Sequence, residues 1–112
     1  MAHAVRSGLA TALSPADLAT RRHRVVLVDV RDTKKSQGGT IEGALSVPLE
    51  KLRARIAKLA KGRELVFLDD NGRAGYLAAR IARGHGATAA YLSGGLLAWT
   101  AEGRPLRKGG RR

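Results

Sequence analysis

The pattern of hydrophobic and polar positions predicts strands that alternate with helices along most of the chain. Aliphatic and β-branched residues dominate 24–30 (RVVLVDV) and 64–68 (ELVFL). Continuous apolar runs of this length are typical of strands buried on both faces, as in a parallel sheet. A shorter extended piece is expected at 43–49 (GALSVPL), because Pro48 disfavours helix in the residue before it, and a weaker strand at 88–92 (TAAYL).

Helical patterns occupy the stretches between these runs. Ser14 as the N-cap and Pro15 at the first helical position predict a short helix over residues 14–24. Further helices are expected over 75–84 and, after a Gly-Gly turn, over 94–103. Strands that alternate with helices predict an α/β fold in which a mainly parallel β-sheet is flanked by helices.

Residues 49–62 have the pattern of one amphipathic surface helix that Gly62 closes. The apolar face comprises Leu49, Leu52, Ile56 and Leu59, and the opposite, basic face comprises Lys51, Arg55 and Lys58.

The composition indicates a single domain. A chain of 112 residues can bury a core without disulfides or metals, and 44% hydrophobic against 4% aromatic residues makes that core aliphatic. We expect an N-terminal extension at 1–13, a domain at 14–106 and a basic tail at 107–112. No apolar run approaches the roughly 18 residues of a membrane helix. The acid-free residues 1–13 leave an organelle-targeting segment open, although a cytoplasmic location is favoured.

The charge balance is strongly basic and indicates an acidic partner. Twenty-one Lys and Arg against nine Asp and Glu give a formal net charge of +12. Basic residues cluster at 20–24 (TRRHR), on the basic face of the expected surface helix and at 104–112 (RPLRKGGRR). Such clusters can be simple solvated faces, or they can bind nucleic acid in a salt-sensitive, sequence-independent way. A place in a larger assembly with an unidentified protein partner is the third alternative.

The absence of cysteine limits the reactions that this chain could catalyse. No disulfide, Cys-ligated zinc or thiol-based mechanism is available to this chain. The three histidines, His3, His23 and His85, show no metal-ligand spacing, so we expect neither a metal nor a cofactor. In parallel α/β sheets, ligands bind beyond the carboxyl ends of the strands, which singles out the loops after Val30 and Leu68.

Several segments together resemble a rhodanese-like domain. In the first half, the matching positions are Asp29, Val30, Arg31, Ile41, Gly43, Ala44, Pro48 and Leu49. In the second half, 63–86 resembles the family's strand, active-site loop and following helix, and 91–99 (YLSGGLLAW) its closing motif. The resemblance covers about residues 14–106 and implies a rhodanese-like three-layer fold.

The resemblance also implies a missing nucleophile. Working members carry Cys-x-x-Gly-x-Arg after this strand and transfer sulfane sulfur through a cysteine persulfide. Alignment on Gly72 places Asp69 at the cysteine and Ala74 at the arginine. A shifted loop lets Arg73 replace the arginine and puts Leu68 at the cysteine. Neither alignment supplies a thiol, and a hard carboxylate cannot hold sulfane sulfur.

The candidate site is therefore a loop without its catalytic residue. The loop comprises Asp69, Asp70, Asn71, Gly72, Arg73, Ala74 and Gly75, and the candidate pocket-lining residues are Asp29, Arg31 and Tyr76. Loop N–H groups and a helix N-terminus should still attract an anion, and Asp69 itself can be that anion. Evolutionary drift in a domain without chemistry is the alternative. For Asp29 and Arg31, a structural role in tying loops together is favoured.

These observations predict a non-catalytic binding, regulatory or structural module. The alternative is thiosulfate sulfurtransferase function, which either holds only at the level of the family or is rescued by a partner's cysteine. An acyl-phosphate mechanism on 25–33 (VVLVDVRDT) is disfavoured, because Arg31 stands where haloacid-dehalogenase-type phosphatases have a second aspartate.

Overall fold

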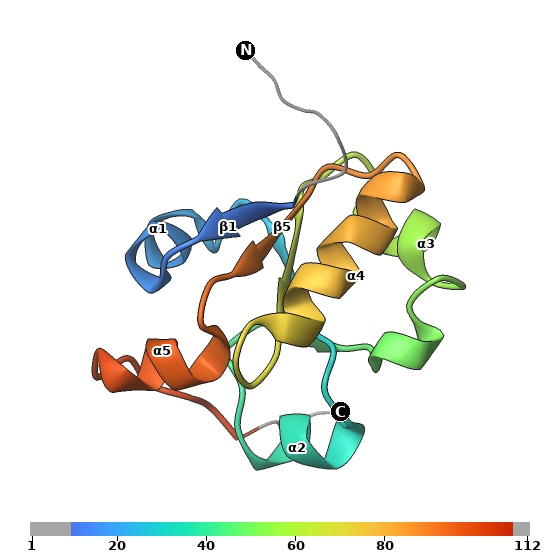
Figure 1. Cartoon of the computed structure of the whole chain (residues 1–112). Helices are drawn as coiled ribbons and strands as arrows, with labels where there is room; N and C mark the ends of the chain where they lie inside the picture. Colours follow the sequence, from blue (N-terminus) through green and yellow to red (C-terminus); the bar gives the residue numbers. More distant parts are fainter. Residues whose placement is uncertain (1–9, 109–112) are drawn as a thin grey trace.

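The apolar runs predicted as buried strands lie side by side at the centre of one parallel sheet (Figure 1). The computed structural model describes residues 10–108. Their five strands are arranged, from edge to edge, in the order β1 (Thr11–Leu13), β5 (Ala89–Leu92), β4 (Leu65–Leu68), β2 (Val26–Asp29) and β3 (Leu45–Ser46). All the strand pairs are parallel.

Helices cover both faces of the sheet, which gives the three layers expected of a rhodanese-like α/β fold. Alternate residues of β4 point to opposite faces. Val66 and Leu68 belong to a core that includes residues of α1 (Pro15–Arg21) and α5 (Gly95–Ala101). Leu65 and Phe67 belong to a second core, which includes residues of two helices on the other face, α3 (Ile56–Ala60) and α4 (Arg73–Gly84). Because both faces are covered, every residue of β4 is buried.

The prediction of a single helix over residues 49–62 is wrong. The chain instead forms a 3-10 turn, η2 (Leu49–Lys51), and the short helix α3. Hydrogen bonds with i→i+3 spacing, such as Arg55 N–H to the Leu52 carbonyl, tighten the chain between them. Leu52 and Ile56 are buried and Leu49 and Leu59 are partly buried, so the amphipathic pattern identified the inward face but not the helical continuity.

Two elements were not predicted. The strand β1 lies inside the segment expected as an N-terminal extension, where its pairing with β5 makes residues 11–13 part of the sheet. A second helix, α2 (Thr33–Gly38), forms in the polar stretch expected as a loop. At the other end, Arg107 pairs with Thr40 in an antiparallel bridge, so the expected tail begins in contact with the domain. The rest of both terminal segments, residues 1–9 and 109–112, lies outside the described residues.

Within residues 10–108, no helix is both long and apolar enough to cross a membrane.

Candidate functional site

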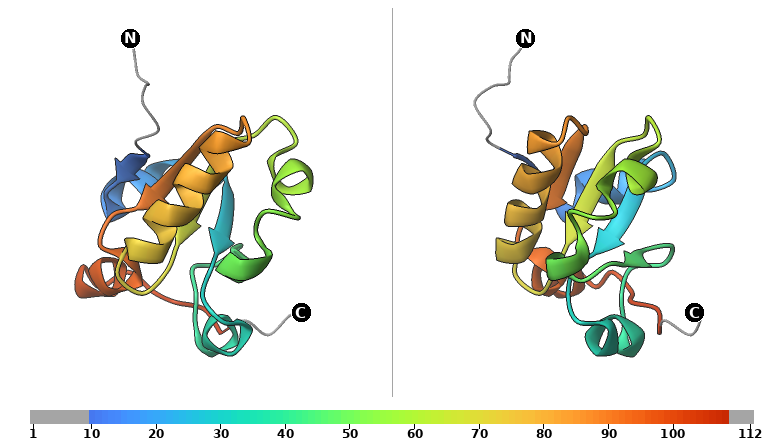
Figure 2. Two further views of the ribbon diagram at one scale, coloured as in Figure 1. Left: turned by 45° about the vertical axis from the view of Figure 1, so that its right-hand side comes forward. Right: turned by 90° about the vertical axis from the view of Figure 1, so that its right-hand side faces the viewer.

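The candidate loop lies where β4 ends and α4 begins. All strands of a parallel sheet run in the same direction, so the carboxyl end of β2 lies beside the carboxyl end of β4. Asp29 is in register with Leu68. In both views of Figure 2, the helices α2 and α5 lie at the bottom of the molecule, on the side where these strands end. The helix α4 begins at Arg73, two residues before the predicted start at Gly75.

The Asp69 carboxylate is bound by the loop's own backbone. Its side chain is buried, with 5% of the residue exposed. Oδ1 accepts a hydrogen bond from the Gly72 N–H at 2.7 Å, and Oδ2 accepts one from the Ala74 N–H at 3.0 Å. Gly72 has φ +98°, a conformation that other residues rarely adopt. The loop therefore provides two donors to an anion, and that anion is part of the chain.

The same loop forms the N-terminal cap of α5. The Asp69 carbonyl accepts a hydrogen bond from the Leu96 N–H at 2.8 Å, and the Asp70 carbonyl accepts one from the Leu97 N–H at 3.0 Å. The two backbones approach so closely at Gly95 that a β-carbon there would lie 2.5 Å from the Asn71 nitrogen. The Gly-Gly turn recognised in the sequence thus holds the candidate loop in place.

A buried ion pair between Asp29 and Arg31 helps to join the loop after β2 to the loop after β4. Asp29 is fully buried, and its Oδ2 accepts hydrogen bonds from Arg31 Nη2 at 2.8 Å and from Thr40 Oγ1 at 2.7 Å. Arg31 Nη2 also donates to the Gly39 carbonyl at 2.6 Å, and Nη1 lies 3.3 Å from Asp70 Oδ1. Burial alone would lower the pKa of the Arg31 guanidinium, but the hydrogen bonds and charges of Asp29 and, to a smaller extent, Asp70 raise this pKa above its usual value.

Asp70 points outward and pairs with two cations. Besides Arg31, it accepts a hydrogen bond from Lys35 Nζ at 2.8 Å. This hydrogen bond is the main reason that the pKa of Asp70 lies below its usual value, and the same contact raises the pKa of Lys35. The sequence analysis did not identify Lys35 as a site residue, although it follows β2 and so lies at the same end of the sheet as the loop after β4.

The remaining candidate residues lie at the first turns of α4. Asn71 Oδ1 accepts the Arg73 N–H at 3.0 Å. The Arg73 side chain is exposed and forms no salt bridge with the acids of residues 10–108. The ring of Tyr76 packs edge-on against Tyr91, with 5.4 Å between centroids, and Arg80 lies over it. These contacts hold Tyr76 against β5.

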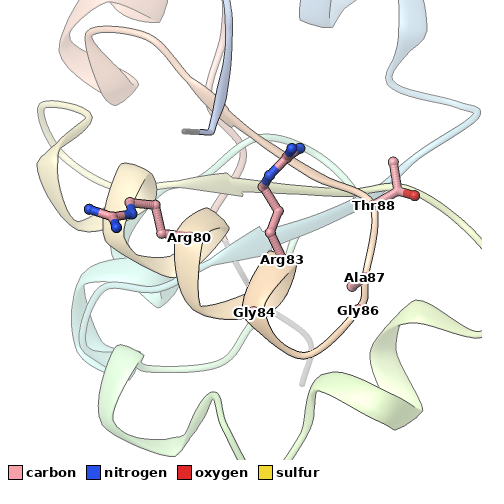
Figure 3. Close-up of a pocket in the computed structure, with 6 residues that line it drawn as sticks. All are labelled: Arg80, Arg83, Gly84, Gly86, Ala87 and Thr88. Carbon is pink, nitrogen blue, oxygen red and sulfur yellow. The ribbon is translucent and has the colours of Figure 1, made fainter. Parts of the chain in front are cut away.

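Two cavities lie near the amino ends of the strands, away from the candidate loop. A cavity of about 490 Å³ lies between the last turns of α4 and the segment before β5; Figure 3 shows its lining residues Arg80, Arg83, Gly84, Gly86, Ala87 and Thr88. A second cavity, of about 280 Å³, is lined by Arg21, Arg24, Val25 and Glu64. In the part of the chain that the structure describes, no three His, Asp or Glu side chains are grouped so that they could hold a metal ion.

Comparison with known proteins defines the family. Residues 14–102 match the family described as Rhodanese-like domain, and the chain therefore belongs to this family. The chain is 36% identical over 105 residues to an HTH-type transcriptional regulator of Mycobacterium tuberculosis, covering 88% of this chain and 45% of the regulator. It thus spans less than half the length of that relative.

A second relative supports the same family, and a solved structure shows the same fold. A sulfurtransferase of Allochromatium vinosum is 31% identical over 84 residues, which cover 73% of this chain and 78% of that protein. The crystal structure of a rhodanese-related protein from Thermoplasma volcanium has a TM-score of 0.81 at 22% identity, covering 87% of this chain and 97% of the other. The family and the α/β fold expected from the sequence are confirmed, and the chain has no cysteine to serve at the position that Asp69 occupies.

Proposed function

We propose that this rhodanese-like domain is non-catalytic and acts as a binding, regulatory or structural module. The observation that carries the proposal is the pairing of the Asp69 carboxylate with the N–H groups of Gly72 and Ala74. In a working rhodanese these loop donors would stabilise a thiolate. Here a carboxylate occupies them, and it is neither soft enough to attack sulfane sulfur nor able to hold it.

The ion pairs around Asp70 support the same interpretation. Arg31 and Lys35 lie next to the loop, and both are paired with Asp70, whereas Arg73 in the loop is exposed. An incoming anion such as thiosulfate would have to displace Asp70 to reach Arg31 and Lys35, and Asp69 to reach the backbone donors. The loop therefore provides its own anions at these two positions.

A regulatory role is supported by the similarity to a transcriptional regulator over 88% of this chain. In the proposed role the domain contributes a surface rather than a reaction. The net charge of +12 makes an acidic partner, either a protein or nucleic acid, the favoured contact.

A thiosulfate:cyanide assay tests the non-catalytic proposal. The purified chain and an Asp69→Ala variant are both expected to give the background rate of the buffer, with an active sulfurtransferase as the positive control. Turnover by the wild-type chain above that background, lost in Asp69→Ala, would overturn the proposal.

The alternative function is sulfur transfer, favoured by the 31% identity to a sulfurtransferase. Because this chain has no cysteine, that function needs a thiol from a partner protein. The two functions are distinguished by repeating the assay with small-molecule thiols and with a cysteine-containing protein acceptor. A rate increase that depends on this chain would favour the alternative.

A further inference from the structure

The connections that lead into β2, β4 and β5 form a basic surface opposite the candidate loop. They comprise residues 22–25, 61–64 and 85–88, and Glu64 is their only acidic residue. Figure 2 shows the connections into β4 and β5 at the top of the molecule, whereas α2 and α5 lie at the bottom. At the opposite, carboxyl ends of β2 and β4, the acids Asp29 and Asp70 pair with Arg31 and Lys35. The positive charge of the three connections is therefore less balanced by acids than the charge around the candidate loop.

The strand register brings the basic residues of these connections together. Val26, Leu65 and Ala89 are neighbours across β2, β4 and β5, which lie roughly 4.8 Å apart as in any sheet. Arg24 and Arg63 each stand two residues before such a position, and Arg63 Nη2 donates to the Val25 carbonyl. Their two chain segments are consequently adjacent.

The last turns of α4 add two basic residues beside the connection into β5. Arg80 and Arg83 line the 490 Å³ cavity together with Thr88, whose carbonyl accepts a hydrogen bond from the Leu65 N–H (Figure 3). The Arg80 guanidinium also lies over the Tyr76 ring. Lys61 precedes β4 and is exposed. We define the basic edge as Arg24, Lys61, Arg63, Arg80 and Arg83. Among residues 10–108, no acidic side chain forms a salt bridge with any of these five residues, since Glu64 pairs with Arg21.

The composition of the basic edge fits a phosphate backbone better than a folded protein. Protein interfaces are anchored by large apolar or aromatic side chains. Of the large exposed hydrophobic residues of the described chain, Leu45, Leu77, Leu97 and Leu106, none lies in the three connections, and only Leu77 lies on α4 with Arg80 and Arg83. A row of guanidinium and ammonium groups instead matches repeated phosphates, which Arg and Lys bind without reading sequence.

The aromatic residues favour a duplex over a single strand. Single-strand binders stack bases on exposed aromatic rings. Phe67 and Trp99 are buried, and the partly exposed Tyr76 and Tyr91 pack against each other, so none of the four offers a fully exposed ring. We infer that the basic edge is a docking surface for the sugar-phosphate backbone of duplex DNA, which it binds without sequence preference. This inference rests on the proposed function, to which it adds the partner and the surface.

A matched pair of variants of the full chain tests the inference. The edge variant combines Arg24→Gln, Lys61→Gln and Arg80→Gln, three exposed side chains with no salt bridge to the acids of residues 10–108. The control variant combines Lys51→Gln, Arg53→Gln and Arg55→Gln in the segment from η2 to α3 and removes the same charge. Thermal unfolding of both variants checks that they are folded.

The measurement is fluorescence anisotropy of a labelled duplex of arbitrary sequence across a salt series. Five phosphate contacts predict a slope of log K against log[salt] of about −4.5 for the wild type. The edge variant should lose about 0.9 per contact and reach about −2, whereas the control variant keeps a slope near the wild-type value. A single strand of equal length should bind more weakly than the duplex.

Four outcomes would overturn the inference. They are no binding to the duplex at about 50 mM salt, where phosphate contacts are strongest, equal weakening of the two variants, stronger binding to the single strand, and equal binding to polyglutamate, which would indicate an acidic protein partner. None of these four binding results is evidence for or against sulfur transfer. The thiosulfate:cyanide assay therefore tests the non-catalytic proposal independently.

Discussion

The carboxylate of Asp69 lies 2.7 Å from the backbone nitrogen of Gly72, inside the loop that connects β4 to α4. Its second oxygen accepts a hydrogen bond from the Ala74 N–H at 3.0 Å, so the backbone of the loop binds both carboxylate oxygens. Asp69 is therefore a structural residue of this loop, and its contribution can be measured by substitution.

Replacing Asp69 with alanine should destabilise the domain by about 2 kcal/mol, because the buried Gly72 N–H and the partly buried Ala74 N–H lose their acceptor. Urea denaturation measures the free energy of unfolding, and hydrogen exchange at Gly72 and Ala74 should accelerate. Asp69→Asn is the matched control. Its amide oxygen can still accept from one N–H, so an intermediate loss is expected. An alanine variant as stable as the wild type would show that the carboxylate does not hold the loop and would favour drift.

Arg31→Ala should cost about 3 kcal/mol, because the fully buried Asp29 carboxylate loses its counter-charge. Arg31→Lys keeps the charge but has no planar fork to reach Asp29, the Gly39 carbonyl and Asp70 together, so a smaller loss is expected. Chemical denaturation of the three proteins provides the comparison. If the alanine variant loses less than about 0.5 kcal/mol of unfolding free energy, the effect is that of an ordinary surface substitution. That result would contradict the interpretation that Arg31 ties the loops together.

The pH dependence of stability should report on Asp70. Its folded-state pKa lies below the usual value, so the folded chain binds this proton more weakly than the unfolded chain. The stabilisation is therefore complete above the unfolded pKa of about 3.9, and it is lost as the pH falls through the folded-state pKa. Asp70→Asn should flatten the fall of the unfolding free energy below about pH 4.

The neighbouring Asp32→Asn is the control for this titration, since Asp32 is exposed and takes no part in the ion pairs of residues 10–108. Unfolding free energies measured from about pH 7 down to about pH 2 give both slopes. Equal flattening by the two variants would mean that the Lys35 and Arg31 contacts of Asp70 contribute nothing specific.

Sequence patterns predicted the centre of the fold better than its periphery. The strands β2 and β4 are buried on both faces, so their apolar runs carry a strong signal. By contrast, β1 has three residues and two of them are exposed, and its pairing with β5 spans most of the chain. The helix α2 buries only Ser36, so no apolar periodicity marks it. Local pattern cannot reveal elements that are fixed by distant contacts.

The candidate site, like the fold, was predicted only in part. The resemblance identified Asp69 by its position along the chain, and the rule for parallel α/β sheets singled out the loops after β2 and β4. The contact of Lys35 with Asp70 depends on the unpredicted helix α2, which presents this side chain to the loop. The contact between Asn71 and Gly95 depends on the tertiary approach of α5, for which a Gly-Gly pair alone is a weak signal.

Gly95→Ala should test how strictly α5 positions the candidate loop. Gly95 has φ +62°, and a β-carbon there would lie 2.5 Å from the Asn71 nitrogen and 2.6 Å from the Asp70 carbonyl oxygen. Gly103→Ala is a matched control, because Gly103 has φ +77° but no heavy atom within 4 Å of the position that a β-carbon would take. The control should lose about 1 kcal/mol from backbone strain alone. Gly95→Ala should lose roughly a further 1–3 kcal/mol, because the clash forces two backbones apart. Equal losses in thermal or urea unfolding would show that the loop yields freely, and α5 would then not be what holds Asp69 and Asp70 in their places.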